Sequence, residues 1–122
     1  MIARKIFPLN LTTSTDELKE LIAKHPDYPI VVMAGYDASC PDYTYTYCSS
    51  ISFSVGMILD CETPYTNEEV MMDEDDFKEN IAYCLGDEYE DLSDEEFDRL
   101  VEDTATKYQE YWKDVIIITV DN

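Results

Sequence analysis

The chain has 122 residues, a hydrophobic fraction of 45 % and a formal net charge of -20. The length suits one domain with one core, and the ten Tyr, four Phe and one Trp make the chain too apolar for a disordered acidic tail. So large a negative charge disfavours direct binding to nucleic acid or to an anionic membrane, and it favours basic protein surfaces.

The N-terminal residues hold two basic side chains but no sustained apolar run and no small-residue cleavage site, so no signal peptide is predicted. No stretch reaches the roughly 20 apolar residues that span a bilayer. We therefore expect a soluble protein of the cytoplasm. The four cysteines are irregularly spaced without a Cys-x-x-Cys pair, and a chain with this much core does not need disulfides, which favours free thiols: Cys40, Cys48, Cys61 and Cys84.

In chain order, a short strand or extended arm fits residues 2–11. The first clear element is a helix that begins near Ser14 and ends at His25. Ser14 and Glu17 form a capping-box pattern. The apolar side chains that follow repeat with helical spacing, at Leu18, Leu21 and Ile22. The proline after His25 ends the helix.

Residues 30–34 form a continuous apolar run, which predicts a strand covered on both faces in the centre of a sheet. Residues 43–47 and 51–59 alternate in polarity and predict a hairpin with a turn near Ser49 and Ser50. The tyrosines of the first alternating segment, Tyr43, Tyr45 and Tyr47, have two interpretations. They pack across strands on a half-exposed sheet, or they form a contact platform for a protein partner.

Residues 70–72 fit a short edge strand. Asp73 is the predicted N-cap of a second helix, which ends before Gly86 and buries one face: Phe77, Ile81, Cys84 and Leu85. After an acidic connector, Ser93 and Glu96 form another capping box. It opens the longest predicted helix, residues 93–112, with a buried stripe of Phe97, Leu100, Val101, Tyr108, Tyr111 and Trp112.

The chain closes with residues 115–120, a strand as apolar as residues 30–34. These two strands should lie in the middle of one sheet. The sequence therefore predicts a single α+β domain over residues 1–122, with a mixed sheet of four to five strands and about three helices packed on it.

Catalytic and metal chemistry find little support in the sequence. The single histidine, His25, lies at a helix end, which favours a structural role. There is no Gly-x-Ser-x-Gly motif, no phosphate-binding loop and no paired Cys and His spacing for zinc. EF-hand registers that start at Asp73 or Asp87 place Lys78 or Leu92 where the turn glycine belongs. We therefore predict no catalytic residue, no metal site, no cofactor and no enzymatic activity.

Residues 60–103 hold 19 Asp or Glu against Lys78 and Arg99, and so carry -17 of the net charge. One interpretation is a solvating surface. The other starts from the helix over residues 93–112, which would run about 28 Å with carboxylates outward beside those of the helix at Asp73. Duplex DNA presents one phosphate charge per roughly 1.7 Å of axis, and a double row of carboxylates offers basic proteins the same attraction. The candidate partner-binding residues are the acids of these helices and their connector: Asp73, Glu74, Asp75, Asp76, Asp87, Glu88, Glu90, Asp91, Asp94, Glu95, Asp98 and Glu102.

Several stretches together resemble a known group of proteins. They are the capped helix leading into His-Pro-Asp-Tyr-Pro-Ile-Val-Val-Met at residues 25–33, the Tyr-rich middle, the acidic helical segment, and Trp-Lys-Asp-Val-Ile-Ile-Ile-Thr-Val-Asp at residues 112–121. This pattern resembles small acidic proteins of unknown function encoded by phages and prophages of Gram-positive bacteria. The resemblance supplies no catalytic residues. It implies a role in the bacterial host cell, because small acidic phage proteins include anti-CRISPR and anti-restriction inhibitors that mimic DNA.

Charge and resemblance together predict an inhibitor that binds the basic nucleic-acid-binding surface of a host defence nuclease, of CRISPR or restriction type, by acidic DNA mimicry. The alternative is a non-enzymatic interaction or regulatory module that binds through residues 43–47, with the acidic surface only solvating the protein. Neither interpretation specifies an oligomeric state.

Overall fold

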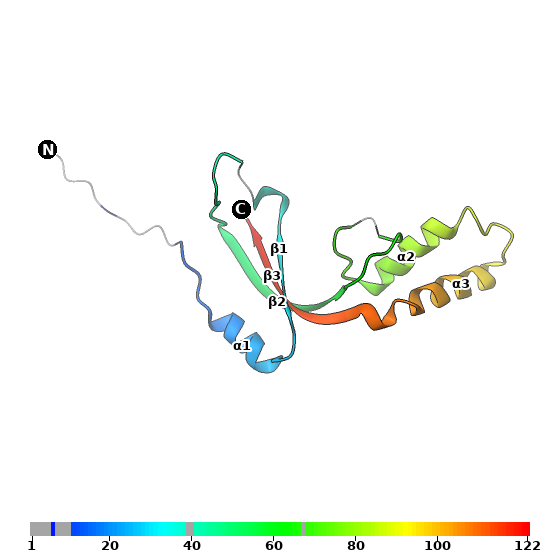
Figure 1. Ribbon diagram of the computed structural model, residues 1–122, viewed down its shortest axis with the longest axis horizontal. Coiled ribbons are helices and arrows are strands. Elements are labelled where there is room, and N and C mark those ends of the chain that lie inside the picture. The colour runs from blue at the N-terminus through cyan, green and yellow to red at the C-terminus, as the bar shows by residue number, and fades with distance from the viewer. Residues whose placement is uncertain (1–5, 7–10, 39–40, 67) are drawn as a thin grey trace. The chain divides into compact units, whose positions relative to one another are not determined.

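The computed structural model describes residues 6, 11–38, 41–66 and 68–122, and Figure 1 shows its elements. Their order is α1 (Asp16–Lys24), β1 (Ile30–Ala34), η1 (Tyr36–Ala38), β2 (Ser50–Leu59), α2 (Glu74–Leu85), α3 (Asp94–Thr106), η2 (Gln109–Tyr111) and β3 (Trp112–Asp121), where η marks a 3-10 turn. The fold class is α+β with three α-helices, as predicted.

The described strands form one mixed sheet in the order β1-β3-β2. β1 and β3 are parallel, with Ile30 aligned to Ile116 and Ala34 aligned to Val120. Backbone hydrogen bonds close both ends of this ladder, from Ile116 N to Pro29 O (2.9 Å) and from Gly35 N to Val120 O (2.8 Å). Three strands are found in the described residues, so the predicted count of four to five is not confirmed.

β1 has the predicted bounds, but it lies at the edge of the sheet rather than in its centre. Its side chains alternate between exposed and half-buried. The central strand is β3, in which Val115, Ile116 and Ile117 are buried. The apolar run therefore predicted the β1 strand correctly, but the predicted central position was wrong. The place of a strand in a sheet depends on which other strands pair with it.

The predicted hairpin is wrong, because residues 43–45 form a bend, residues 46–47 are irregular, and β2 begins only at Ser50. Alternating polarity gives a strand only where a neighbouring strand supplies hydrogen bonds. Residues 70–72 also form no strand, although Leu59 N donates to Met71 O at 2.9 Å. The arm predicted over residues 2–11 lies mostly outside the described residues.

The chain divides into two compact units. We call Met1–Val55 with Ile116–Asn122 the sheet unit, and Gly56–Val115 the helical unit. The sheet unit has 7 acidic and 4 basic residues, a balance of -3, and the helical unit has 21 and 4, a balance of -17. Almost all of the negative charge therefore belongs to one unit.

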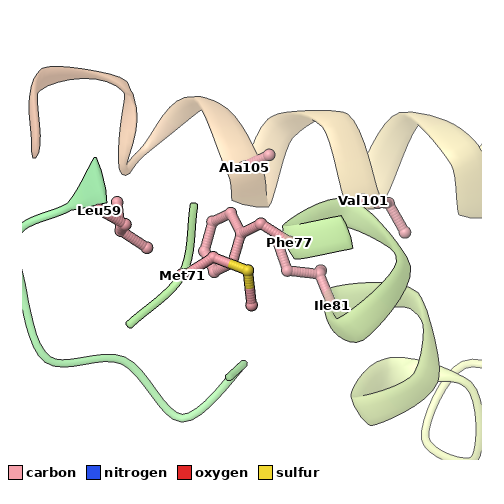
Figure 2. Close-up of a cluster of buried hydrophobic side chains, with 6 residues drawn as sticks. All are labelled: Leu59, Met71, Phe77, Ile81, Val101 and Ala105. Atoms are coloured by element: carbon pink, nitrogen blue, oxygen red, sulfur yellow. The ribbon is translucent and has the colours of Figure 1, made fainter. Parts of the chain in front are cut away.

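The core of the helical unit lies between α2, α3 and the end of β2. Figure 2 shows its six buried side chains, Leu59, Met71, Phe77, Ile81, Val101 and Ala105. The Phe77 ring stands edge-on to Tyr108 (5.2 Å between centroids, 89° between planes) and to Trp112 (6.0 Å, 73°). Since Phe77 is near the start of α2 and Tyr108 follows α3, the two helices form an antiparallel hairpin, which Figure 1 also shows.

The starts of α2 and α3 confirm the predicted caps. Asp73 Oδ1 accepts hydrogen bonds from the backbone N–H groups of Asp75 (2.8 Å) and Asp76 (3.1 Å). Ser93 Oγ accepts from the backbone N–H of Glu96 (3.2 Å) and donates to its Oε1 (2.9 Å). These bonds satisfy N–H groups that have no partner inside a helix.

The other helix predictions need correction. At α1 the N-cap is Thr15, without a side-chain cap, and Ser14 Oγ accepts from Asp16 N (3.2 Å), so the Ser14 capping box is not formed. α3 ends at Thr106, which makes it about 20 Å long. Lys107 N and Tyr108 N bond the carbonyls three residues back (3.2 and 3.0 Å). This tightens the chain into a turn before β3.

Two residues assigned to buried helical stripes, Cys84 and Tyr111, are exposed. Tyr111 belongs to the 3-10 turn η2 that follows α3, where helical periodicity no longer applies. The stripe positions inside the helices, Phe77, Ile81 and Leu85 in α2 and Phe97, Leu100 and Val101 in α3, are buried or half-buried as predicted. Tyr108 and Trp112 are half-buried too, but they lie beyond α3.

Candidate partner-binding surface

All twelve candidate carboxylates lie in the helical unit, and eleven are exposed while Glu74 is half-buried. They do not form one continuous double row. Because α2 and α3 are antiparallel, residues 73–76 lie at one end of the hairpin and residues 87–95 lie at the other. The length of α2, 12 residues, separates these ends by about 18 Å. Residues 73–76 and 87–95 are therefore separate groups of acids, and Asp98 and Glu102 of α3 lie between the two ends.

Part of this acidity has a structural explanation. Asp73 caps α2, and the acids that follow it occupy the first helical turn, as residues 94–96 do in α3. Carboxylates at these positions are stabilised by the positive end of the helix dipole. Glu102 Oε2 lies 3.2 Å from Lys78 Nζ and links the two helices. The charge of these residues is therefore no evidence for a partner by itself.

Four carboxylates between the helices have no such explanation: Asp87, Glu88, Glu90 and Asp91, which we call the acidic turn. All four are exposed, and no ion pair found in the described part of the chain involves them. Residues 87–98 together contain eight acids and no base. The repulsion among these charges opposes folding, so their value to the protein lies in solvation or in binding.

A hollow of about 270 Å³ lies next to the acidic turn in the helical unit. It is lined by Tyr65, Leu85, Tyr89, Leu100, Thr104, Lys107 and Tyr108. Tyr65 and Tyr108 meet edge to face, with 6.2 Å between ring centroids. Its walls come from a loop, both helices and the connector. No motif in the sequence marks such a scattered set, so sequence reasoning missed it.

The described cysteines, Cys48, Cys61 and Cys84, are free thiols. Burial raises the pKa of the Cys61 thiol, and the carboxylate of Asp60 raises it further, so this thiol is a poor nucleophile. His25 stacks on Tyr28, with 4.4 Å between ring centroids. Among the described residues, no group of three or more His, Cys, Asp or Glu could hold a metal ion.

No protein family, curated protein or solved structure matches this chain. No helix in the described ranges is both long and apolar enough to cross a membrane. The fold and the surface define an α+β protein with an acidic helical hairpin. The resemblance to phage proteins and the inhibitor function stay predictions.

Proposed function

We propose that this protein is an inhibitor of a host defence nuclease, of CRISPR or restriction type. It binds the basic surface on which the nuclease holds nucleic acid, and it presents carboxylates where DNA presents phosphates. The observation that carries this proposal is the acidic turn, whose four carboxylates are exposed and take part in no ion pair found in the described part of the chain. Such a group of charges attracts a basic groove strongly and accelerates its association.

Because the hairpin is antiparallel, we place the proposed contact at the end that holds the acidic turn. The acids of residues 73–76 lie at the opposite end, and they have roles in capping and opening α2. The acidic turn therefore makes the principal contact, and Asp94, Glu95 and Asp98 of α3 extend it along the helix. A groove that holds this end of the hairpin cannot hold DNA at the same time.

Charge reversal tests whether the arrangement of the acids matters. The variant D87K/E88K/E90K/D91K reverses the acidic turn, and the control E17K/D27K/D37K/D42K reverses four exposed acids of the sheet unit. Each changes the formal net charge from -20 to -12. For a nuclease captured from the host, we expect the turn variant to lose at least about tenfold in affinity and the control to stay close to wild type. Equal losses in both variants, or none in the first, would contradict the proposal.

A second candidate function has one observation in its favour: Tyr43 is 70 % exposed and Tyr45 is 91 % exposed. Exposed tyrosines are common anchors at protein interfaces, and these two lie in a bend rather than in a sheet. Salt separates the two functions. DNA mimicry requires affinity to fall steeply between about 0.05 and 0.5 M salt, since charges more than a few ångströms apart are then screened. An interface built on Tyr43 and Tyr45 should change little, and it should weaken in Y43A/Y45A.

A further inference from the structure

The hollow beside the acidic turn is lined mainly by aromatic and aliphatic side chains. Its volume is about 270 Å³, and its lining includes three tyrosines, Tyr65, Tyr89 and Tyr108. Leu85 and Leu100 add apolar surface. All of these residues belong to the helical unit. Pockets for drug-sized ligands begin at about 300 Å³, so this hollow has the size for one long side chain.

The aromatic wall of the hollow is held in place by contacts within the helical unit. Tyr108 meets Tyr65 edge to face and also stands edge-on to the buried ring of Phe77, with 5.2 Å between those centroids. In the connector, Leu92 N donates to Tyr89 O at 3.3 Å, which closes a turn around Tyr89. The wall is therefore formed before a ligand arrives, and this lowers the entropic cost of binding.

The charge around the hollow favours a positively charged ligand. Tyr89 lies in the acidic turn between Glu88 and Glu90, and the four carboxylates of that turn are exposed. The helical unit as a whole has a balance of -17. Aromatic rings attract cations through the negative charge of their faces. Three tyrosines beside exposed carboxylates therefore suit a cation that has an apolar stem.

Thr104 favours a ligand that donates hydrogen bonds. It lines the hollow and is only 8 % exposed. Its Oγ1 donates to Leu100 O at 2.8 Å, so the hydroxyl proton is already used and the oxygen has only lone pairs left to offer. A guanidinium supplies N–H donors, whereas a carboxylate supplies only acceptors. A guanidinium is therefore complementary to Thr104, and a carboxylate is not.

We propose that the hollow binds an arginine side chain of a protein partner, with the guanidinium against the tyrosine rings and the acidic turn at the rim. A guanidinium is planar, weakly hydrated and always charged, and it stacks on aromatic rings better than the compact lysine ammonium does. The aliphatic stem of the arginine lies along Leu85 and Leu100. That the arginine belongs to a defence nuclease rests on the proposed function, whereas the fit of the hollow to an arginine side chain does not.

Lys107 is a base in the wall of the hollow, and its charge opposes this ligand. It is exposed, as expected for a lysine whose stem covers apolar surface while its ammonium stays in water. Its single charge acts against the four carboxylates of the acidic turn. Removing the charge of Lys107 should therefore strengthen the binding of a cation, whereas it would weaken the binding of an anion.

Titration of the full chain with N-acetyl-argininamide tests the inference without a nuclease, while NMR follows the methyl groups of Leu85 and Leu100. N-acetyl-citrullinamide is the matched neutral probe, because it has the same length without the charge. We expect saturable binding of the arginine probe, with a dissociation constant on the order of millimolar for so small a ligand, and at least about threefold weaker binding of the citrulline probe. No saturation up to about 50 mM arginine probe, or equal binding of the two probes, would overturn the inference.

Two matched pairs of variants locate the site. Y89L removes a ring of the hollow, and its control Y83L removes a tyrosine of α2 that is 87 % exposed and does not line the hollow. K107M and its control K113M each change the formal net charge from -20 to -21, but Lys113 lies in β3 and pairs with Asp60. All four positions are exposed, so each variant should fold, and circular dichroism checks that it does.

We expect Y89L to weaken binding of the arginine probe at least about threefold and Y83L to leave it close to wild type. K107M should strengthen binding by about twofold or more, and K113M should change it less. Equal effects of Y89L and Y83L would overturn the inference. So would a K107M variant that binds the arginine probe no more tightly than K113M does.

The outcomes also separate this inference from the proposed function. If D87K/E88K/E90K/D91K loses the nuclease while Y89L binds it as tightly as Y83L does, and the arginine probe does not bind, the hollow is no arginine site but the DNA mimicry stands. If the arginine probe binds and Y89L weakens it, but the protein binds no nuclease, the inference stands and the proposed function fails.

Discussion

The two units of this chain differ in the surface that each presents to solvent. The helical unit closes around Phe77 and Ile81 and presents charge outward, with a balance of -17. The sheet unit has a balance of -3 and leaves apolar side chains of its outer strands exposed. Charge on the helical unit provides attraction over a long range, whereas exposed apolar area on the sheet unit provides association only on contact.

The largest expected difference in stability between the two units is at two phenylalanines, one in each unit. Phe77 is buried in the core of the helical unit, and Phe53 is half-buried in the part of β2 that belongs to the sheet unit. We expect Phe77→Ala to cost about 3–5 kcal/mol of unfolding free energy, because it leaves a cavity, and Phe53→Ala to cost well under half of that. Urea denaturation of both variants measures the difference. Equal costs would mean that the sheet unit is as closed as the helical unit.

The next largest expected loss of stability is at a glycine, Gly35, and Gly86 is its control. The Asp121 carboxylate lies against Gly35 so closely that a Cβ at this position would overlap it. At Gly86, which caps α2 with φ -56°, a Cβ would meet the Ala82 carbonyl at 3.3 Å and the Tyr83 carbonyl at 3.8 Å. Gly35→Ala should therefore cost about 1–3 kcal/mol and Gly86→Ala within about 0.5 kcal/mol, by thermal or urea unfolding.

A rescue variant identifies the cause of the Gly35 effect. Adding Asp121→Ala to Gly35→Ala removes the overlapping carboxylate and should recover most of the lost stability. If the double variant is no more stable than Gly35→Ala alone, steric overlap is not the reason for glycine at this position.

Two serines with the same sequence pattern should differ by a smaller amount. Ser93 caps α3 through its side chain, whereas α1 in the sheet unit has no side-chain cap and Ser14 bonds only Asp16 N. Ser93→Ala should cost about 1 kcal/mol and Ser14→Ala a few tenths. Amide hydrogen exchange at the first turn of each helix measures the two effects locally. A larger loss of exchange protection at α1 than at α3 would contradict the assignment of the side-chain cap to α3.

The smallest expected effect is at the ion pair between α2 and α3. The Lys78 and Glu102 side chains are 35 % and 60 % exposed, so solvent screens their attraction. Lys78→Met should change stability by no more than about 1 kcal/mol. Urea unfolding at low and high salt measures it. A loss of several kcal/mol would show that the hairpin depends on this pair more than on its apolar core.

Local features of the sequence predicted local features of the structure. Asp73, and Ser93 with Glu96, specify helix starts because each cap uses atoms within three residues. The alternation of residues 51–59 likewise gave β2 almost to its bounds. Short-range patterns were sufficient at these places, although the same Ser-x-x-Glu pattern at Ser14 forms no capping box.

Features that depend on distant residues were not predictable in this way. The edge position of β1 follows from its pairing with β3, which begins more than 80 residues later in the chain. Residues 43–47 alternate as a strand does, yet they form a bend and irregular structure outside the described sheet. The separation of the acids into two groups required the antiparallel arrangement of α2 and α3, which the residue pattern of neither helix contains.

The most direct test of the proposed DNA mimicry is a competition between this protein and DNA for one site. A nuclease captured from the host is loaded with fluorescent duplex DNA, and the wild type or D87K/E88K/E90K/D91K is added while fluorescence anisotropy reports the bound DNA. The account predicts that the wild type displaces DNA completely and less effectively as salt rises, and that the variant leaves DNA bound. A ternary complex in which nuclease holds DNA and this protein together would contradict it.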